Sequence, residues 1–355
     1  MGTRVAVVGA GWSGFTATTP GVSYKELMFA AASRAYEDAG VDPRTQVDSF
    51  VACSEDLEEG TSIFDEYVPD QLGAVQRPVH TIAADGLFGV VTGVMLIGSG
   101  VARTVAVEAH SKASDVVSLG RIDRFALDPV LNRPLGIAPV ALAGLEMRAL
   151  LEATGRTVED CAEVASRNRD HARSNPRVAD PPTAPPPHPL ADPLTADQAA
   201  EPADGCVVLV LAAADESGTG PAPTVTIDGV GWHQDAPSLE SRSWDRAVYA
   251  ERACADAYRR AGIAPADVDL AEVDDRFAYK QLQHLDAAGL ADLDPARVNA
   301  SGGALGEGDL REANGLARAL ACVERLRAGD GATALALAWR GLPSSSGAAV
   351  VMRRG

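Results

Sequence analysis

Apolar and polar positions along the chain form a helix-then-strand pattern that occurs twice. The segment 35–52 ends a helical stretch at Gly40, passes a proline-containing turn and enters an apolar strand at residues 49–52. The segment 257–273 repeats this order, with Gly262 after the helix and an apolar strand at residues 270–273. A glycine directly after a helix and a proline just beyond it are typical of a helix end. Both segments therefore predict the same local structure.

A second pattern follows each copy in the same order. Residues from Gly86 to Gly100 are almost entirely apolar and precede a strand beginning at Thr104, while residues from Gly315 to Gly329 precede a strand beginning at Thr333. A helix that is apolar on all sides has no face for water and must lie between two layers. Two matching patterns in one order indicate a duplicated α/β fold with the first apolar helix buried centrally.

The region between the copies predicts an insertion. Two helices are expected at residues 141–153 and 158–172, and a proline-rich segment at 181–187 excludes regular helix or central strand there. A buried strand then resumes at residues 206–212. We therefore divide the chain into an N-terminal half, an insertion and a C-terminal half. Their residues are 1–120 with 200–225, 121–199, and 226–355.

Charge and composition exclude several classes of function. The chain has 31 basic and 49 acidic side chains and a net charge of −18, which would repel nucleic acid and anionic membranes. No apolar run approaches the roughly 20 residues of a membrane-spanning helix, and the first residues do not resemble a signal peptide. The five cysteines are widely spaced, as reduced core residues would be. We expect a cytoplasmic protein with no nucleic-acid or membrane partner.

One glycine motif suggests a nucleotide site and is better explained otherwise. Residues 9–14 match the pattern GxGxxG after an apolar strand. That motif works only when a helix begins at the loop and points its N-terminus at a pyrophosphate. Helix-forming residues here begin only near Tyr24, after a Thr-Thr-Pro segment. We therefore expect a loop that ends the strand and no dinucleotide site.

Four stretches carry a resemblance to a known family. They are the first strand with its glycine, the turn before the apolar helix, the segment after the strand of the second copy, and a later glycine-rich segment: residues 5–9, 81–87, 272–277 and 298–306. With the duplication, they make the chain similar to the thiolase superfamily, especially the sterol-carrier-protein-type and archaeal thiolases. The likeness extends over essentially the whole chain.

The resemblance implies an α/β fold of five layers, αβαβα, with two mixed sheets and an inserted loop and helical region. Such proteins are usually dimers. They act on an acyl thioester of coenzyme A or of a carrier protein, so the thioester is a substrate, and we expect neither a bound cofactor nor a metal.

The resemblance also shows what this chain lacks. Family members carry a nucleophilic cysteine at the turn before the buried helix, where the helix dipole and a histidine favour a thiolate. Ala83 occupies that position. The positions of the family's histidines hold Asp274 and Glu307, and the late cysteine loop reads Ala-Trp-Arg-Gly-Leu-Pro at 338–343. A methyl group forms no thioester, so ordinary thiolysis is excluded.

Carboxylates stand where the family has its bases. Asp274 and Glu307 are expected to face each other across the pocket, with Asp275 beside them as a further catalytic candidate. Two carboxyl groups in a partly desolvated cleft push their pKa values apart, so one holds a proton while the other is ionised. This arrangement suits proton transfer to or from a hydroxyl or an enolate without a covalent intermediate.

The remaining pocket candidates are expected to bind substrate. Asp85 either takes part in this or caps the apolar helix. Arg340 either binds a carboxylate or phosphate oxygen or pairs with Asp275 or Glu307. The backbone at Gly302 and Gly303 is a candidate oxyanion donor. The full set is Ala83, Asp85, Asn299, Ser301, Gly302, Gly303, Trp339 and Arg340.

Two functions follow as hypotheses. Some thiolase-like proteins that act on steroid side-chain thioesters lack the nucleophile, are retro-aldolases, and work with a small OB-fold/zinc-ribbon partner. This chain resembles them but has Asp274 where they have a tyrosine. We therefore expect aldol-type or non-covalent Claisen-type chemistry. The alternative is a degenerate subunit that supports an active paralogous thiolase or the OB-fold/zinc-ribbon protein.

Overall fold

The computed structural model describes residues 3–56, 60, 63–214, 224–236, 238–341 and 346–355. Within them, nine strands form a mixed sheet in the order β3-β2-β4-β7-β1-β8-β11-β10-β9. They are β1 (Val5–Thr16), β2 (Ser49–Cys53), β3 (Val79–Ile82), β4 (Thr104–Lys112), β7 (Asp204–Ala213), β8 (Val225–Gln234), β9 (Leu270–Val273), β10 (Thr333–Arg340) and β11 (Ser346–Arg354). A separate hairpin joins β5 (Pro189–Ala191) to β6 (Leu194–Thr195).

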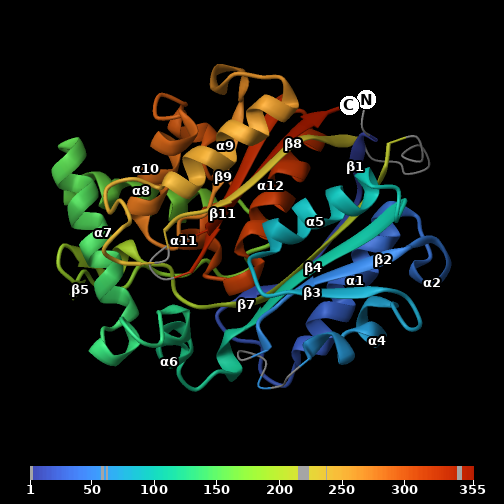
Figure 1. Cartoon of the computed structure of the whole chain (residues 1–355), viewed down its shortest axis with the longest axis horizontal. Helices are drawn as coiled ribbons and strands as arrows, with labels where there is room; N and C mark the ends of the chain where they lie inside the picture. Colours follow the sequence, from blue (N-terminus) through green and yellow to red (C-terminus); the bar gives the residue numbers. More distant parts are fainter. Residues whose placement is uncertain (1–2, 57–59, 61–62, 215–223, 237, 342–345) are drawn as a thin grey trace.

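Helices connect most of these strands, whereas among the described elements β7 is followed directly by β8 and β10 by β11 (Figure 1). The helices are α1 (Tyr24–Ala39), α2 (Pro43–Gln46), α4 (Pro69–Leu72), α5 (Gly86–Gly98), α6 (Leu119–Asp123), α7 (Pro139–Thr154), α8 (Val158–Ala172), α9 (Val248–Ala261), α10 (Ala278–Ala288), α11 (Gly303–Glu307) and α12 (Asn314–Ala328). Among the described helices, none combines the length and apolarity needed to cross a bilayer.

The strand pairings confirm the duplication. In the first half β2 is parallel to β4, β4 antiparallel to β7, and β7 antiparallel to β1. In the second half β9, β10, β11 and β8 repeat these relations in the same order. The first half adds the parallel edge strand β3, whose counterpart is a single parallel bridge between Ala271 and Val298. The two halves join where β1 and β8 share three residue pairs.

The layers follow from which helices cover which faces. Helices α5 and α12 pack against each other and against strands of both halves, so their side chains form one core with the inner faces of the sheet. Helix α1 covers the outer face of the first half and α9 the outer face of the second. The expected five layers are confirmed, and the largely apolar α5 is in the central one (Figure 1). The two mixed sheets expected from the sequence are instead the two halves of one nine-stranded sheet, joined through β1 and β8.

The GxGxxG segment is a correction to the sequence interpretation. Strand β1 does not end at residue 9 but continues through the motif to Thr16. A Cβ on Gly9 or Gly11 would lie 2.2 Å from a backbone oxygen of α1, so these glycines let the helix approach the strand closely. Gly229 and Gly231 do the same for β8 and α9, where an added Cβ would lie 2.1 and 2.0 Å from backbone oxygens.

The inserted region packs on the second half of the fold. Helix α8 covers α11 and α10, and α7 also contacts α10. Met147, Leu150, Val164 and Tyr279 belong to the shared core between these helices. The predicted helix at 158–172 is confirmed with those bounds, whereas the other begins two residues earlier and ends one later than predicted. The insertion therefore covers the part of the second half that contains α10 and α11, the first two helices that come after β9 in the chain.

Candidate functional site

The carboxyl ends of the parallel strands bring the candidate residues together. Ala83 follows β3, Asp274 follows β9, Arg340 ends β10, and Glu55 comes two residues after β2. Arg340 forms an ion pair with Glu55, which joins the strand ends of the two halves. The charges of Asp274 and Arg340 also act on Asp85 at the start of α5. Ligands of open α/β sheets bind at such strand ends.

Ala83 lies in the turn between β3 and α5 with its side chain exposed. The five cysteines are all buried and unbridged, which confirms the prediction that they are core residues. Burial raises the pKa of the Cys53 and Cys322 thiols well above the ordinary range, which opposes formation of a thiolate. Among the described residues, no group of three or more histidine, cysteine, aspartate or glutamate side chains could hold a metal ion.

Asp85 connects the starts of the two central helices. Its Oδ1 accepts a hydrogen bond from the Leu87 N–H in α5 at 2.8 Å, and its Oδ2 accepts one from the Gly315 N–H in α12 at 2.8 Å. The capping alternative is therefore confirmed, and the carboxyl group also serves the second helix. Burial raises the pKa of Asp85 to about 7, although both backbone bonds favour the charged form.

We expect the wild-type protein to lose stability relative to an Asp85→Asn variant as pH rises from about 4 to about 7. In that range the unfolded carboxyl ionises near its ordinary value of 3.8, while the folded one keeps its proton. The difference in free energy of unfolding should change by up to about 1.4 kcal/mol per pH unit. Urea unfolding of both proteins from pH 4 to 8 measures it. If the stability of the wild type relative to the variant instead rises with pH, the hydrogen bonds from the helix N–H groups lower the pKa of Asp85 more than burial raises it.

Asp274 is buried and only partly satisfied. Its Oδ1 accepts a hydrogen bond from the Arg276 N–H at 3.0 Å, whereas its Oδ2 has no hydrogen-bond partner among the described residues. Burial raises the pKa of Asp274, and the charge of Asp309 raises it further, against the opposing charge of Arg276. Burying a carboxyl oxygen without a hydrogen-bond partner costs folding free energy, and such groups with shifted pKa values cluster at functional sites. Asp274 is therefore a candidate for proton transfer.

Asp275 points the other way, toward α11. Its Oδ1 accepts a hydrogen bond from the Ala304 N–H at 2.5 Å and its Oδ2 one from the Asn168 amide at 2.6 Å. Burial raises the pKa of Asp275 to about 7 despite the nearby charge of Arg318. A Cβ on Gly303 would lie 2.2 Å from Oδ2, so this close contact requires glycine.

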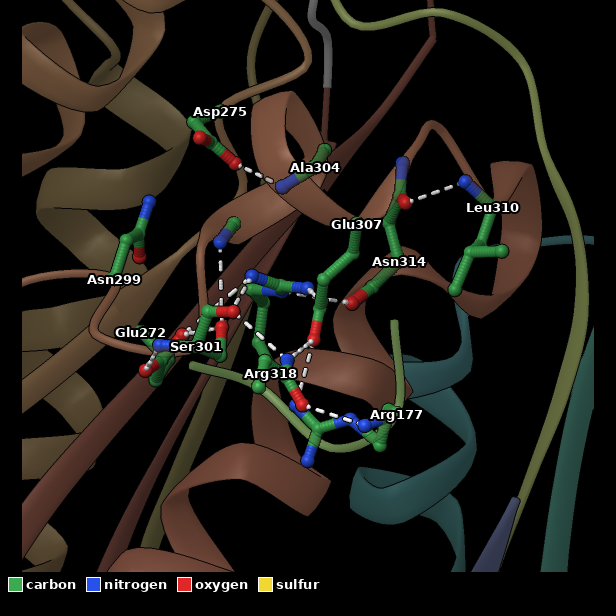
Figure 2. A network of polar contacts seen from close by, with 12 residues as sticks. Arg177, Glu272, Asp275, Asn299, Ser301, Ala304, Glu307, Leu310, Asn314 and Arg318 are labelled. Atoms are coloured by element: carbon green, nitrogen blue, oxygen red, sulfur yellow. Dashed lines mark hydrogen bonds and ion pairs between the residues drawn. The ribbon is translucent and has the colours of Figure 1, made fainter. Parts of the chain in front are cut away.

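Glu307 lies in a buried ion-pair network centred on Arg318 (Figure 2). Arg318 of α12 donates to Glu307 and, at 3.1 Å, to the Ser301 hydroxyl, and its Nη1 lies 3.5 Å from Glu272. Arg177 of the inserted region donates to the other Glu307 oxygen at 2.6 Å. The carboxylate predicted as a catalytic partner of Asp274 is thus held by two guanidinium groups.

The glycine-rich segment is held by its own hydrogen bonds. The Asn299 side chain accepts from the Val273 N–H at 2.7 Å and donates to the Val273 carbonyl at 2.9 Å, extending the edge of β9. The Gly302 N–H donates to the Asn299 carbonyl at 2.9 Å, and the Gly303 N–H to the Ser301 hydroxyl at 3.3 Å. An oxyanion role for these two N–H groups would require both bonds to break.

Arg340 and Trp339 occupy the end of β10, where the late loop begins, and residues 342 and 343 of that loop lie outside the described residues. Arg340 forms ion pairs with Glu55 and Glu312. The pairing predicted with Asp275 or Glu307 is wrong, because Asp275 contacts α11 and Glu307 contacts Arg177 and Arg318.

Lys280 is one of three lysines in the sequence and a possible Schiff-base residue, and the structure places it in a buried cluster whose other members the sequence did not indicate. Lys280 of α10 lies 2.8 Å from Glu146 of α7 and donates to Gln283 at 2.7 Å. Its ammonium group is 5.3 Å from the Trp339 ring centre, and burial lowers the pKa of Lys280 to about 8. The sequence did not indicate the ion pair between Lys280 and Glu146, because the two residues lie far apart along the chain.

Comparisons with known proteins agree with this geometry. No protein-family model matches the chain. An acetyl-CoA acetyltransferase of Methanothermobacter thermautotrophicus is 25% identical over 351 residues, which cover 91% of each chain. The solved Ltp2-ChsH2(DUF35) aldolase matches with a TM-score of 0.81 and 20% identity, covering 99% of this chain and 98% of its own.

A solved human mitochondrial 3-ketoacyl-CoA thiolase in complex with CoA matches with a TM-score of 0.77 at 20% identity, covering 99% of this chain and 98% of its own. The structural likenesses show a shared fold, and the acetyltransferase extends the likeness to sequence along nearly the whole chain. With a duplicated sheet, two central helices and Ala83 at the turn before α5, the chain has the thiolase fold and resembles the thiolase superfamily as a divergent relative.

Proposed function

We propose that the chain makes or breaks a carbon–carbon bond of an acyl thioester without an acyl-enzyme intermediate. The carrier of the thioester is coenzyme A or a carrier protein. The observation that carries the proposal is Asp274, a buried carboxyl group with a raised pKa and one oxygen without a partner among the described residues. Its charge acts on Asp85, which follows Ala83 by two residues. The human thiolase solved with CoA, and the aldolase of the same fold, support this choice of substrate and reaction.

In the cleavage direction the substrate is a β-hydroxyacyl thioester. Ionised Asp274 takes the proton of the hydroxyl group, the hydroxyl oxygen becomes a carbonyl, and the bond between the α and β carbons breaks. The electron pair of that bond forms the enolate of the shortened thioester. Asp274 then returns its proton to the α carbon, so an aldehyde or ketone and a shorter acyl thioester leave. Formation of the bond is the same sequence in reverse.

The carboxyl groups of Asp274 and Glu307 take different roles in this proposal. Asp274 transfers the proton, whereas Glu307 keeps Arg318 and Arg177 in place beneath the glycine-rich segment. Asp275 holds the start of α11. The other predicted binding residues border the same strand ends and are proposed to shape the pocket rather than react.

A panel of β-hydroxyacyl thioesters of coenzyme A and of a carrier protein tests the proposal. We expect release of an aldehyde or ketone with an equal amount of shortened thioester, and an intact protein mass that never rises by the mass of an acyl group. Cleavage accompanied by an acylated protein would contradict the mechanism. No cleavage of any member, with or without a partner protein, would contradict the function.

A supporting role in a complex is the second candidate. It is favoured by the extent to which Glu307, Asp275, Asn299 and Ser301 already have hydrogen-bond partners elsewhere in the chain, and by the two components named in the Ltp2-ChsH2(DUF35) aldolase. In that case the chain binds a small OB-fold/zinc-ribbon protein or a paralogous thiolase, or forms a homodimer. Activity that needs such a partner but survives loss of Asp274 would favour this role.

A further inference from the structure

A small cavity opens next to the proposed proton-transfer residue. Its volume is about 160 Å³, and its walls include Arg276 after β9, Arg340 at the end of β10, Glu55 after β2, and Asp123 and Phe125 from the inserted region. Ligand pockets are usually about 300–1,000 Å³, so this space suits one end of an acyl group rather than a whole thioester. Two of its walls are arginines, although the chain as a whole is strongly acidic.

Arg276 is positioned by an ion pair and an aromatic ring, and its guanidinium group still has donors to offer. Its backbone N–H donates to Asp274, its Nε lies 3.1 Å from Asp309, and its guanidinium carbon is 5.1 Å from the Trp339 ring centre. The two terminal nitrogens form no hydrogen bond with any described residue. A planar guanidinium that lies against one carboxylate and one aromatic ring, with its two terminal nitrogens open, can bind a carboxylate in a bidentate manner.

The other charges of the cavity wall already have partners. Arg340 pairs with Glu55 and Glu312, and Asp123 pairs with Arg311 at 2.7 Å. The exposed ring of Phe125 supplies an apolar side. Arg276 is therefore the cation of this wall whose terminal nitrogens remain open to a ligand.

We propose that Arg276 binds an ionised carboxylate at the far end of the substrate's acyl group. The inference rests on the proposed function and narrows it to short acyl thioesters that carry a second carboxylate. The small cavity limits the length of that group, and its position beside Asp274 places the carboxylate near the reacting carbons rather than near the thioester's carrier.

Binding without turnover tests this directly. Succinyl-CoA and butyryl-CoA have acyl chains of the same carbon count and differ mainly in the terminal carboxylate. Titration calorimetry should show that the wild-type protein, and an Asp274→Asn variant, bind succinyl-CoA about tenfold more tightly or better. Arg276→Gln should remove that preference and leave binding of butyryl-CoA unchanged. The exposed control Arg252→Gln should retain it.

Further outcomes decide the question. Arg276→Lys keeps the positive charge but loses the two parallel donors of the guanidinium group, so the preference for succinyl-CoA should become smaller without disappearing. If Arg276→Gln does not fold, Arg276→Lys takes its place in the test. Equal binding of the two thioesters would overturn the proposal, and competition by inorganic phosphate alone would assign the cavity to a phosphate group. A preference that persists while no thioester is ever cleaved would leave the carboxylate site standing and refute the proposed reaction instead.

Discussion

An Asp274→Asn variant is expected to turn over its thioester substrate about 10²–10⁴-fold more slowly than the wild type, the usual contribution of general acid–base catalysis. The amide neither accepts the hydroxyl proton nor returns one to the enolate. It is almost the same size as the carboxyl group and its oxygen can still accept the Arg276 N–H, so the fold should be preserved. Steady-state rates of cleavage measure the effect.

The pH dependence gives a second measure of the same prediction. Because burial raises the pKa of Asp274, the rise of wild-type activity with pH should lie above the ordinary range of an aspartate. The variant should lack that rise. Asp292→Asn, a change of the same kind at an exposed turn residue, serves as the control. Turnover of Asp274→Asn within threefold of the wild type would refute proton transfer by this residue and favour the supporting role.

An Arg318→Met variant is expected to lose about 3–5 kcal/mol of unfolding free energy, the usual result of removing one partner of a buried ion pair. Arg318 is 1% exposed, and its guanidinium group contacts Glu272, Glu307 and Ser301 from the interior of α12. Methionine fills much of the same volume, so the loss reports the carboxylates left without this cation. Urea unfolding measures it.

A double variant separates charge from packing. Glu307 keeps Arg177 when Arg318 is gone, but Glu272 has no other cation within ion-pair distance among the described residues. Adding Glu272→Gln to Arg318→Met should therefore restore about 1 kcal/mol or more. The exposed helical control Arg252→Met should stay within about 0.5 kcal/mol of the wild type. No recovery in the double variant would show that lost packing, rather than unpaired charge, causes the destabilisation.

Local signals predicted much of the fold. The Gly-to-Gly spacing located both central helices, and the strand at 270–273 has the predicted bounds. The glycine motif of β1 led to a wrong prediction of a loop. Its glycines are needed because α1 packs closely against Gly9 and Gly11. A pattern of glycines alone does not tell a turn from a strand that is covered closely by a helix.

The amino-acid sequence by itself determined the duplicated order of helices and strands, since hydrophobic periodicity and helix-ending glycines act over a few residues. It also determined that a methyl group stands at position 83. Only the tertiary structure decided how the charges pair. Arg177 and Arg318 hold Glu307, Arg340 binds Glu55, and Asp85 reaches Gly315, each across a separation that folding alone closes. The protonation state of a buried carboxyl group depends on these neighbours and on the exclusion of water, and neither can be predicted from the residues next to it in the sequence.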